Sequence, residues 1–179
     1  MLTTLKTARF EQLVLPHLGA AYNLAKWLVR EESEAEDMVQ EACLKAFNAF
    51  DSFRGDDARS WLLTIVRNTW YGRFPRRAAA VSIVTTDEDG DDRPDEGLNP
   101  EALVIQQETV ERVRSALEEL PADFREVLVL RELEGLSYKE IAAVVTIPIG
   151  TVMSRLARGR ERLSAVLAAL NTQAARPGR

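Results

Sequence analysis

The sequence predicts an all-α protein of two small helical domains joined by a flexible acidic linker, with a helix-turn-helix in the second domain. Three observations support this fold class. Apolar residues recur at helical spacing on both sides of the chain's middle. Residues 78–99 interrupt that pattern with glycine, proline and a cluster of acids. Residues 136–163 hold two helical patterns separated by a proline-containing break. We therefore expect domains at residues 1–77 and 100–179, with residues 78–99 as the linker.

The first domain is expected to begin with two helices. Residues 7–31 carry apolar positions at helical spacing, and Pro16 is placed to start a new segment as a first-turn proline. Ser33 and Glu36 have the spacing of a capping box, which predicts a further helix over about 34–50.

One face of the helix expected at 34–50 is polar with a leucine at its centre. Its members share an outward arc and are Asp37, Gln40, Glu41, Leu44 and Asn48. A small apolar anchor with a polar rim is typical of a transient protein-docking surface. A single exposed leucine is also ordinary on a soluble protein, so both interpretations stay open here.

The next helix is expected from about Ala58 to Phe74, and its outward side mixes rings with cations. We expect outward positions at Ser60, Leu63, Thr64, Arg67, Tyr71 and Phe74. Residues 54–77 hold six arginines and two aspartates. Aromatic rings interleaved with arginines suit single-stranded nucleic acid, because bases stack on rings and cations follow the backbone. The alternative is that the aromatic residues Trp61 and Trp70 are simply part of the core.

The net charge of −5 comes from the linker. Residues 81–100 carry one basic and seven acidic side chains, whereas residues 1–80 have a net charge of +1 and residues 101–179 are balanced. The acidic total therefore does not exclude a DNA partner. The spacing from Thr85 to Glu96 nearly fits a calcium loop, but Thr85 and Arg93 occupy ligand positions and argue against metal binding.

The second domain is expected to begin with two more helices. Asn99 and Pro100 form a cap and first-turn start for a helix running to about Glu119. Pro121 separates it from a helix that continues to Leu133.

A helix-turn-helix follows. Ser137 and Glu140 form a capping box that opens a helix at Tyr138, residues 146–150 break it, and a second helix follows from about Thr151. The outward arc of that second helix comprises Thr151, Ser154, Arg155, Arg158 and Arg162. Four arginines and one glutamate between positions 151 and 162 favour a helix that enters a DNA major groove. An ordinary helical hairpin with a solvated arginine face is the alternative.

Several function classes are disfavoured. One cysteine, Cys43, excludes an internal disulfide, and the single histidine excludes a Cys/His metal cluster. No apolar run approaches the ~20 residues of a membrane span, and the N-terminus lacks a signal-peptide layout, so we expect a cytoplasmic protein without membrane insertion. No nucleophile–base pair, metal site or phosphate loop is recognisable, so we expect neither an enzyme nor a cofactor.

Two rival functions remain. A dimeric operator-binding regulator would use the helix-turn-helix to bind duplex DNA unaided. A nuclease or DNA-modifying enzyme would use the acidic cluster that includes Asp87, Asp89 and Asp91 to hold a metal.

Two sets of motifs resemble the extracytoplasmic-function sigma factors of the sigma-70 family, in the same order along nearly the whole chain. The first domain of such factors is similar to Glu34–Ala42, Phe53-Arg54-Gly55, Trp61-Leu62 and Arg67-Asn68. The second domain is similar to Leu120-Pro121, Arg125–Leu128, Glu134–Ala142, Gly150-Thr151-Val152, Ser154-Arg155-Leu156 and Arg158.

The resemblance implies a transcription initiation factor that binds core RNA polymerase, at the β′ clamp coiled coil and at β, and directs it to promoters. It implies that the polar face around Leu44 binds polymerase and that the helix from Thr151 reads the −35 element. It assigns the −10 element to Phe53, Arg54, Arg59, Arg67, Asn68, Tyr71, Arg76 and Arg77. The linker would pass through polymerase channels later occupied by RNA. Such factors are commonly held inactive by an anti-sigma protein.

The chain departs from the family's pattern at three positions. Thr146 stands in the turn where glycine is usual, and because a β-branched residue disfavours left-handed angles we expect a differently shaped turn. Met153 replaces a common basic residue of the −35 helix, and Gly72 replaces an Asp or Asn of the −10 helix.

Overall fold

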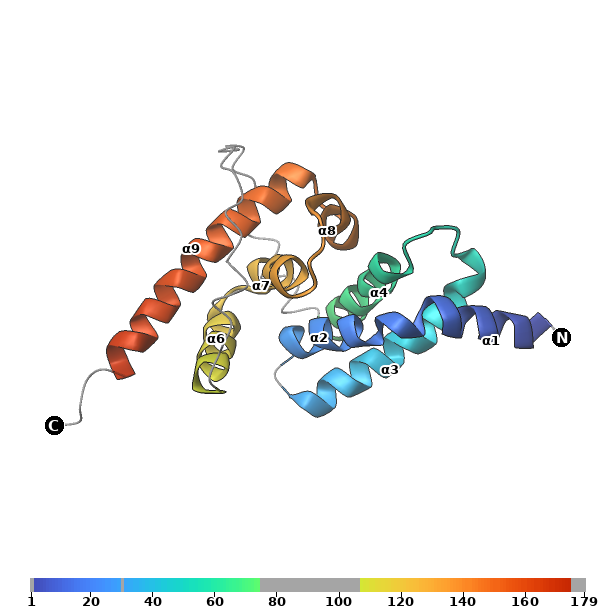
Figure 1. The fold of residues 1–179 in the computed structure, drawn as a ribbon, viewed down its shortest axis with the longest axis horizontal. Coiled ribbons are helices and arrows are strands. Elements are labelled where there is room, and N and C mark those ends of the chain that lie inside the picture. Colours follow the sequence, from blue (N-terminus) through green and yellow to red (C-terminus); the bar gives the residue numbers. More distant parts are fainter. Residues whose placement is uncertain (1, 30, 75–106, 175–179) are drawn as a thin grey trace.

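The computed structural model describes residues 2–29, 31–74 and 107–174, and all regular elements in these ranges are helical. They form two regions (Figure 1). The first helical region comprises residues 2–74 and the second comprises residues 107–174. This agrees with the predicted all-α class. The predicted domain boundaries, the acidic linker with its calcium-like spacing, and the Asn99–Pro100 helix start lie outside the described residues.

The first helical region consists of α1 (Leu2–Leu13), α2 (Leu18–Leu28), α3 (Glu32–Ala49) and α4 (Ala58–Arg73), with short 3-10 turns η1 (Leu15–His17) and η2 (Phe50–Ser52). Helices α2, α3 and α4 pack against one another in pairs. Their apolar faces form a core whose largest buried side chains include Leu24, Leu28, Met38, Leu62 and Trp70. Burial of this apolar area holds the region together, because it removes large side chains from water.

Two of the predicted helix starts differ from the structure. The helical segment expected at 7–31 consists of α1, which already begins at Leu2, and α2. Pro16 lies in the first turn of η1 between them, in the role predicted for it. The predicted capping box of Ser33 and Glu36 is wrong. Helix α3 already begins at Glu32, and its N-cap Glu31 has an extended backbone and makes no side-chain cap.

The second helical region consists of α6 (Gln107–Glu119), α7 (Ala122–Leu128), the π turn η4 (Val129–Leu133), α8 (Tyr138–Val145) and α9 (Ile149–Ala174). The helix predicted between Pro121 and Leu133 is therefore α7 followed by η4. Helix α9 crosses α7 closely at Gly159, where an added Cβ would lie 3.2 Å from Cδ1 of Leu128. Glycine lets the two helices approach closely at this point, since a larger residue would require the Leu128 side chain to shift by a few tenths of an ångström.

The predicted helix-turn-helix is present. Ser137 Oγ accepts a hydrogen bond from the Glu140 N–H (3.3 Å), and the Glu140 carboxylate accepts one from the Ser137 N–H (2.6 Å), which confirms the capping box at α8. Helix α8 ends at Thr146, whose φ of 61° and ψ of 48° are left-handed. The expectation that threonine would reshape this turn is wrong, because Thr146 adopts the left-handed conformation and its N–H closes the helix on Ala142 O. Helix α9 then begins at Ile149, two residues before the predicted start.

The two helical regions pack together. Helix α4 lies against α8, and α2 lies against α7 (Figure 1). The predicted outward orientation of Ser60 and Leu63 is therefore wrong, since both are buried. A helical wheel gives the periodicity of one helix and does not show which other helix packs against its faces. A face that another helix covers can therefore be assigned to solvent by mistake.

Within the described ranges, no single helix is long and apolar enough to cross a membrane. Helices α8 and α9 (to Thr172) meet that test of length and composition only when taken together, and they are bent by 100° at the break between them. No group of three or more His, Cys, Asp or Glu side chains in the described part of the chain is arranged to hold a metal ion.

Candidate functional site

The polar face of α3 surrounds an exposed leucine. Leu44 has 67% of its surface exposed, and Asp37, Gln40 and Asn48 on the same face lie on the solvent side of the helix. The opposite face of α3 is buried through Ala35, Met38, Ala42 and Ala46. A leucine at the centre of a rigid, polar helix face is the composition expected of a protein-docking surface.

Glu41 of this face is held in place by two ion pairs. Its carboxylate accepts from Lys45 Nζ (2.7 Å) on its own helix and from Arg73 Nε (2.6 Å) on α4. These hydrogen bonds, that from Lys45 first and that from Arg73 second, lower the pKa of Glu41. Arg73 also donates to the backbone oxygen of Asp37 (3.4 Å). The contacts fix α3 against α4 without involving the Leu44 side chain.

The loop before α4 carries two of the residues assigned to the −10 element. Phe53 is buried, with its ring centroid 4.9 Å from that of Trp61. Arg54 is exposed and donates to the backbone oxygen of Asp51 (2.8 Å). Phe53 thus supports the loop from inside, whereas Arg54 presents its charge to solvent.

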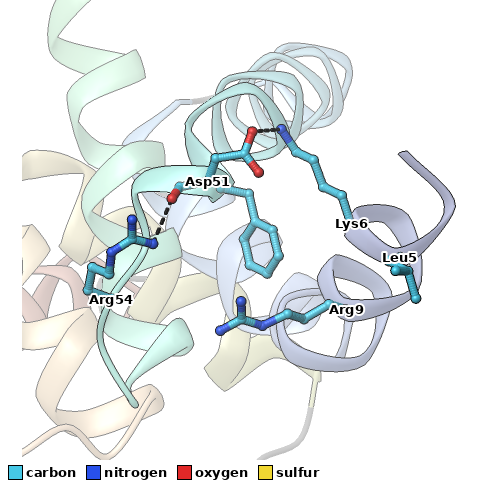
Figure 2. Close-up of a pocket in the computed structure, with 6 residues that line it drawn as sticks. Leu5, Lys6, Arg9, Asp51 and Arg54 are labelled. Atoms are coloured by element: carbon cyan, nitrogen blue, oxygen red, sulfur yellow. Dashed lines mark hydrogen bonds and ion pairs between the residues drawn. The ribbon is translucent and has the colours of Figure 1, made fainter. Parts of the chain in front are cut away.

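A cleft of about 310 Å³ adjoins this loop (Figure 2). Lys6 and Arg9 of α1 and Arg54 of the loop line it, together with Leu5, Phe50 and Asp51. Lys6 Nζ pairs with the Asp51 carboxylate at 2.7 Å, as Figure 2 shows. Three cations and one carboxylate leave a net positive charge, which suits an anion such as a phosphate. No role for α1 was recognisable in the sequence, since single cations on a helix carry no local signal.

Two arginines of α4 face the second helical region. Arg67 donates from Nε and Nη2 to the two carboxylate oxygens of Glu126 on α7, at 2.8 and 3.1 Å. Arg59 pairs with Glu134, with Nη2 at 3.1 Å from Oε2, and also donates to the Glu134 backbone oxygen. Both arginines were assigned to the −10 element, and both are occupied by acids of the second region in this structure.

Tyr71 accompanies Arg67. The Arg67 guanidinium lies 4.3 Å from the centroid of the Tyr71 ring, at cation–π distance. Burial, followed by the charge of Glu126, raises the pKa of Tyr71 to about 12. Asn68, by contrast, is exposed, and Arg76 and Arg77 lie outside the described residues. Only some of the residues assigned to the −10 element therefore lie together on one side of α4 and its loop.

The first turns of α9 carry the residues predicted for the −35 element. Thr151, Ser154 and Arg158 are half-buried, and Ser154 Oγ donates to the Thr151 backbone oxygen at 3.1 Å. Gly150, Ala157 and Glu161, which were not predicted, are exposed on this helix. Val152, Leu156 and Gly159 are buried and form the inward side of this helix.

Two of the predicted −35 arginines turn toward the protein. Arg155 is 17% exposed, with its guanidinium nitrogens 3.9 Å from the carboxylates of Asp123 and Glu126. The Arg162 guanidinium lies 4.7 Å from the Phe124 ring centroid. Both positions flank the buried stripe of α9, so a long side chain there reaches inward as easily as outward.

Sequence reasoning missed the acids that receive these arginines. Asp123 and Glu126 are 0% and 1% exposed, although charged residues are rarely buried. Burial first, opposed by the hydrogen bond from Arg67, raises the pKa of Glu126. No local pattern could have paired Arg67 with Glu126, because 59 positions separate them.

Two family models match the chain. One is described as Sigma-70 region 2 and matches residues 13–79, and the other is described as Sigma-70, region 4 and matches residues 110–163. The matched ranges fall on the two helical regions. Region 2 covers the α3 and α4 surfaces described above, and region 4 covers the helix-turn-helix.

Characterised proteins are similar over most of the chain. The RNA polymerase sigma-H factor of Pseudomonas aeruginosa is 37% identical, over 92% of this chain and 89% of its own. The ECF RNA polymerase sigma-E factor of Escherichia coli is 42% identical, over 73% of this chain and 72% of its own.

Solved structures share the fold. The sigma factor RpoE from Bartonella quintana, in complex with the anti-sigma factor NepR, gives a TM-score of 0.67 at 32% identity, over 89% of this chain and 97% of its own. CnrH, in complex with the cytosolic domain of CnrY, gives 0.64 at 31% identity, over 91% and 90%.

Proposed function

Since the chain belongs to the extracytoplasmic-function sigma factors of RNA polymerase, we propose which of its surfaces bind polymerase, the two promoter elements and an inhibitor. A sigma factor is a transcription initiation factor and not an enzyme. It binds core RNA polymerase and directs it to promoters, and the phosphodiester chemistry belongs to the polymerase.

The α3 face is the proposed polymerase surface. Leu44 is the apolar anchor and Asp37, Gln40, Glu41 and Asn48 form the polar rim, all on one helix fixed to α4 by Arg73. A coiled coil offers apolar stripes flanked by charges, so the β′ clamp coiled coil fits this face. The polymerase β subunit is proposed as a second contact.

The two promoter elements are proposed to bind different helices. The loop with Phe53 and Arg54 and the α4 residues Arg59, Arg67, Asn68 and Tyr71 bind the −10 element as a single strand, and Arg76 and Arg77 extend that contact. Helix α9 enters the major groove of the −35 element. Its contacts come from Thr151, Ser154, Arg155, Arg158 and Arg162, by hydrogen bonding and phosphate neutralisation.

The separation of these surfaces is the observation that carries the proposal. Helices α3 and α9 lie on opposite sides of the molecule (Figure 1). One protein can therefore contact polymerase through the first region while the second region contacts duplex DNA upstream. Because the similar sigma factor RpoE from Bartonella quintana is bound to the anti-sigma factor NepR, we also propose that an anti-sigma protein holds this factor inactive.

The substitution Arg158→Ala tests the −35 assignment. Holoenzyme first selects its binding sequence from a random duplex library, and that duplex then serves as the probe. Arg158→Ala should lower holoenzyme affinity for the probe by about tenfold or more, the usual cost of one base-contacting arginine. Its affinity for core polymerase should not change. Arg112→Ala, which removes an exposed arginine of α6, is the matched control. Equal loss of both affinities would refute the assignment.

A further inference from the structure

A buried cluster of charges joins the two helical regions. At its centre the Arg67 guanidinium donates two hydrogen bonds to the Glu126 carboxylate. Arginine binds carboxylates and phosphates with the same bidentate geometry. Arg67 is 14% exposed and Glu126 is 1% exposed. This cross-region pair is therefore largely shielded from water.

The cluster contains a second buried acidic side chain besides Glu126. Asp123, one turn from Glu126 on α7, is 0% exposed, and neither of its carboxylate oxygens has a hydrogen-bond partner within the described residues. The Arg155 guanidinium lies 3.9 Å from the Asp123 carboxylate and 3.9 Å from that of Glu126. Glu126 is thus shared by Arg67 of the first region and Arg155 of the second, whereas Asp123 lies close to Arg155.

Stability alone does not account for this arrangement. Removing four charges from water costs free energy that ion pairing often fails to offset, and apolar side chains of similar size usually hold an interface better. Other polar contacts between the described parts of the two regions come from Arg59 and Asn23, which bind Glu134, and from Arg125, which donates to the Trp27 backbone oxygen at 3.2 Å. Apolar side chains of both regions pack in one cluster, and the buried charges add to it contacts that another anion or cation could replace.

We propose that Glu126, with the buried Asp123 beside it on α7, forms an acidic cradle for Arg67, so that the second helical region and single-stranded promoter DNA bind the same surface of α4 in turn. The inference rests on the proposed role of Arg67 and Tyr71 at the −10 element. The Arg67 guanidinium cannot bind the Glu126 carboxylate and a phosphate at the same time. Likewise, a base cannot stack on the face of the Tyr71 ring that the Arg67 guanidinium occupies at 4.3 Å. The described arrangement is thus a closed form that excludes the −10 strand.

The test uses the full chain without polymerase. Glu126→Gln keeps the shape of the side chain and removes the charge that holds Arg67. The matched control is Glu132→Gln, which breaks an arginine pair of similar geometry inside the second region, with Arg160 Nη2 at 2.7 Å. Small-angle X-ray scattering gives the radius of gyration, and the anisotropy of fluorescein-labelled (dT)20 gives affinity for single-stranded DNA at several salt concentrations.

Glu126→Gln should increase the radius of gyration and bind (dT)20 about fivefold or more tighter, because one stacking ring and one cation are released. The slope of log affinity against log salt should steepen by about 0.7 for each additional phosphate that the protein neutralises. Adding Arg67→Ala to Glu126→Gln should return the DNA affinity to that of the unmodified protein. The Glu132→Gln control should match the unmodified protein in both measurements.

Two results would overturn the inference, and they are distinguishable. An unchanged radius in folded Glu126→Gln refutes the cradle and leaves the proposed −10 surface standing. A larger radius with unchanged (dT)20 binding refutes the competition, and it also removes DNA from the α4 surface. If circular dichroism shows that Glu126→Gln is unfolded, Arg67→Gln replaces it and breaks the same pair from α4. An unchanged radius of gyration in folded Arg67→Gln would again refute the cradle.

Discussion

Leu44 offers the most direct quantitative test of the polymerase surface. Its side chain projects from α3 with 67% of its surface in water and no role in the core. Leu44→Ala removes the anchor with little effect on folding, since surface substitutions usually change stability by less than about 0.5 kcal/mol. Any loss of polymerase binding can then be attributed to the docking contact.

The expected magnitude follows from the exposed area. Full burial of a leucine side chain contributes roughly 1.5–3 kcal/mol. Because two thirds of Leu44 remains to be buried, its contact with polymerase is worth about 1–2 kcal/mol. That range corresponds to an increase in Kd of about 5- to 30-fold for Leu44→Ala. Leu44→Arg places a charge in the apolar contact and should abolish co-purification with polymerase.

The assay is titration of labelled protein with core polymerase, with thermal unfolding measured in parallel. Leu5→Ala is the matched control, because Leu5 is 68% exposed but lies on α1, away from the α3 face. Its Kd should be unchanged. An unchanged Kd for Leu44→Ala, or an equal loss for Leu5→Ala, would show that α3 is not the docking surface.

Two further predictions concern the helix-turn-helix. Thr146→Gly should stabilise the protein by about 0.5–1 kcal/mol, since relief of the left-handed strain exceeds the entropic cost of glycine, and a Tm above those of both the unmodified protein and Thr146→Ala would verify it. Ser137→Ala should cost about 1 kcal/mol in urea unfolding at neutral pH. The Ser137 hydrogen bonds lower the pKa of Glu140, so the stability they provide is present above the ordinary carboxyl pKa and is lost as pH falls through the lowered value. The difference between Ser137→Ala and the unmodified protein should therefore shrink in acid; a constant difference would count against the capping box.

Local signals in the sequence predicted local structure well. The Ser137–Glu140 box and the Thr146 break were recognisable because caps and helix ends depend on neighbouring residues. Ser33 carried the same signal and failed, since α3 already begins at Glu32 and leaves Ser33 inside the helix. A capping motif specifies a compatible start, and tertiary packing decides whether the helix uses it.

Contacts between distant segments could not be predicted in this way. The faces of α4 and α9 were assigned to solvent by periodicity alone, yet Leu63 is buried and Arg155 turns inward. Both outcomes depend on which other helices pack against α4 and α9. The spacing of residues along one sequence does not show that packing. Sequence motifs therefore located the candidate surfaces. Only the structure shows that two arginines of the α4 surface are paired with Glu126 and Glu134.

In-vitro transcription from a library of genomic fragments tests the central claim, with core polymerase in the presence or absence of this protein. We predict discrete new transcripts that require both components and disappear with Leu44→Arg. Absence of new transcripts from every fragment, together with tight duplex binding by the protein alone, would contradict the assignment of this chain's surfaces to polymerase and promoter.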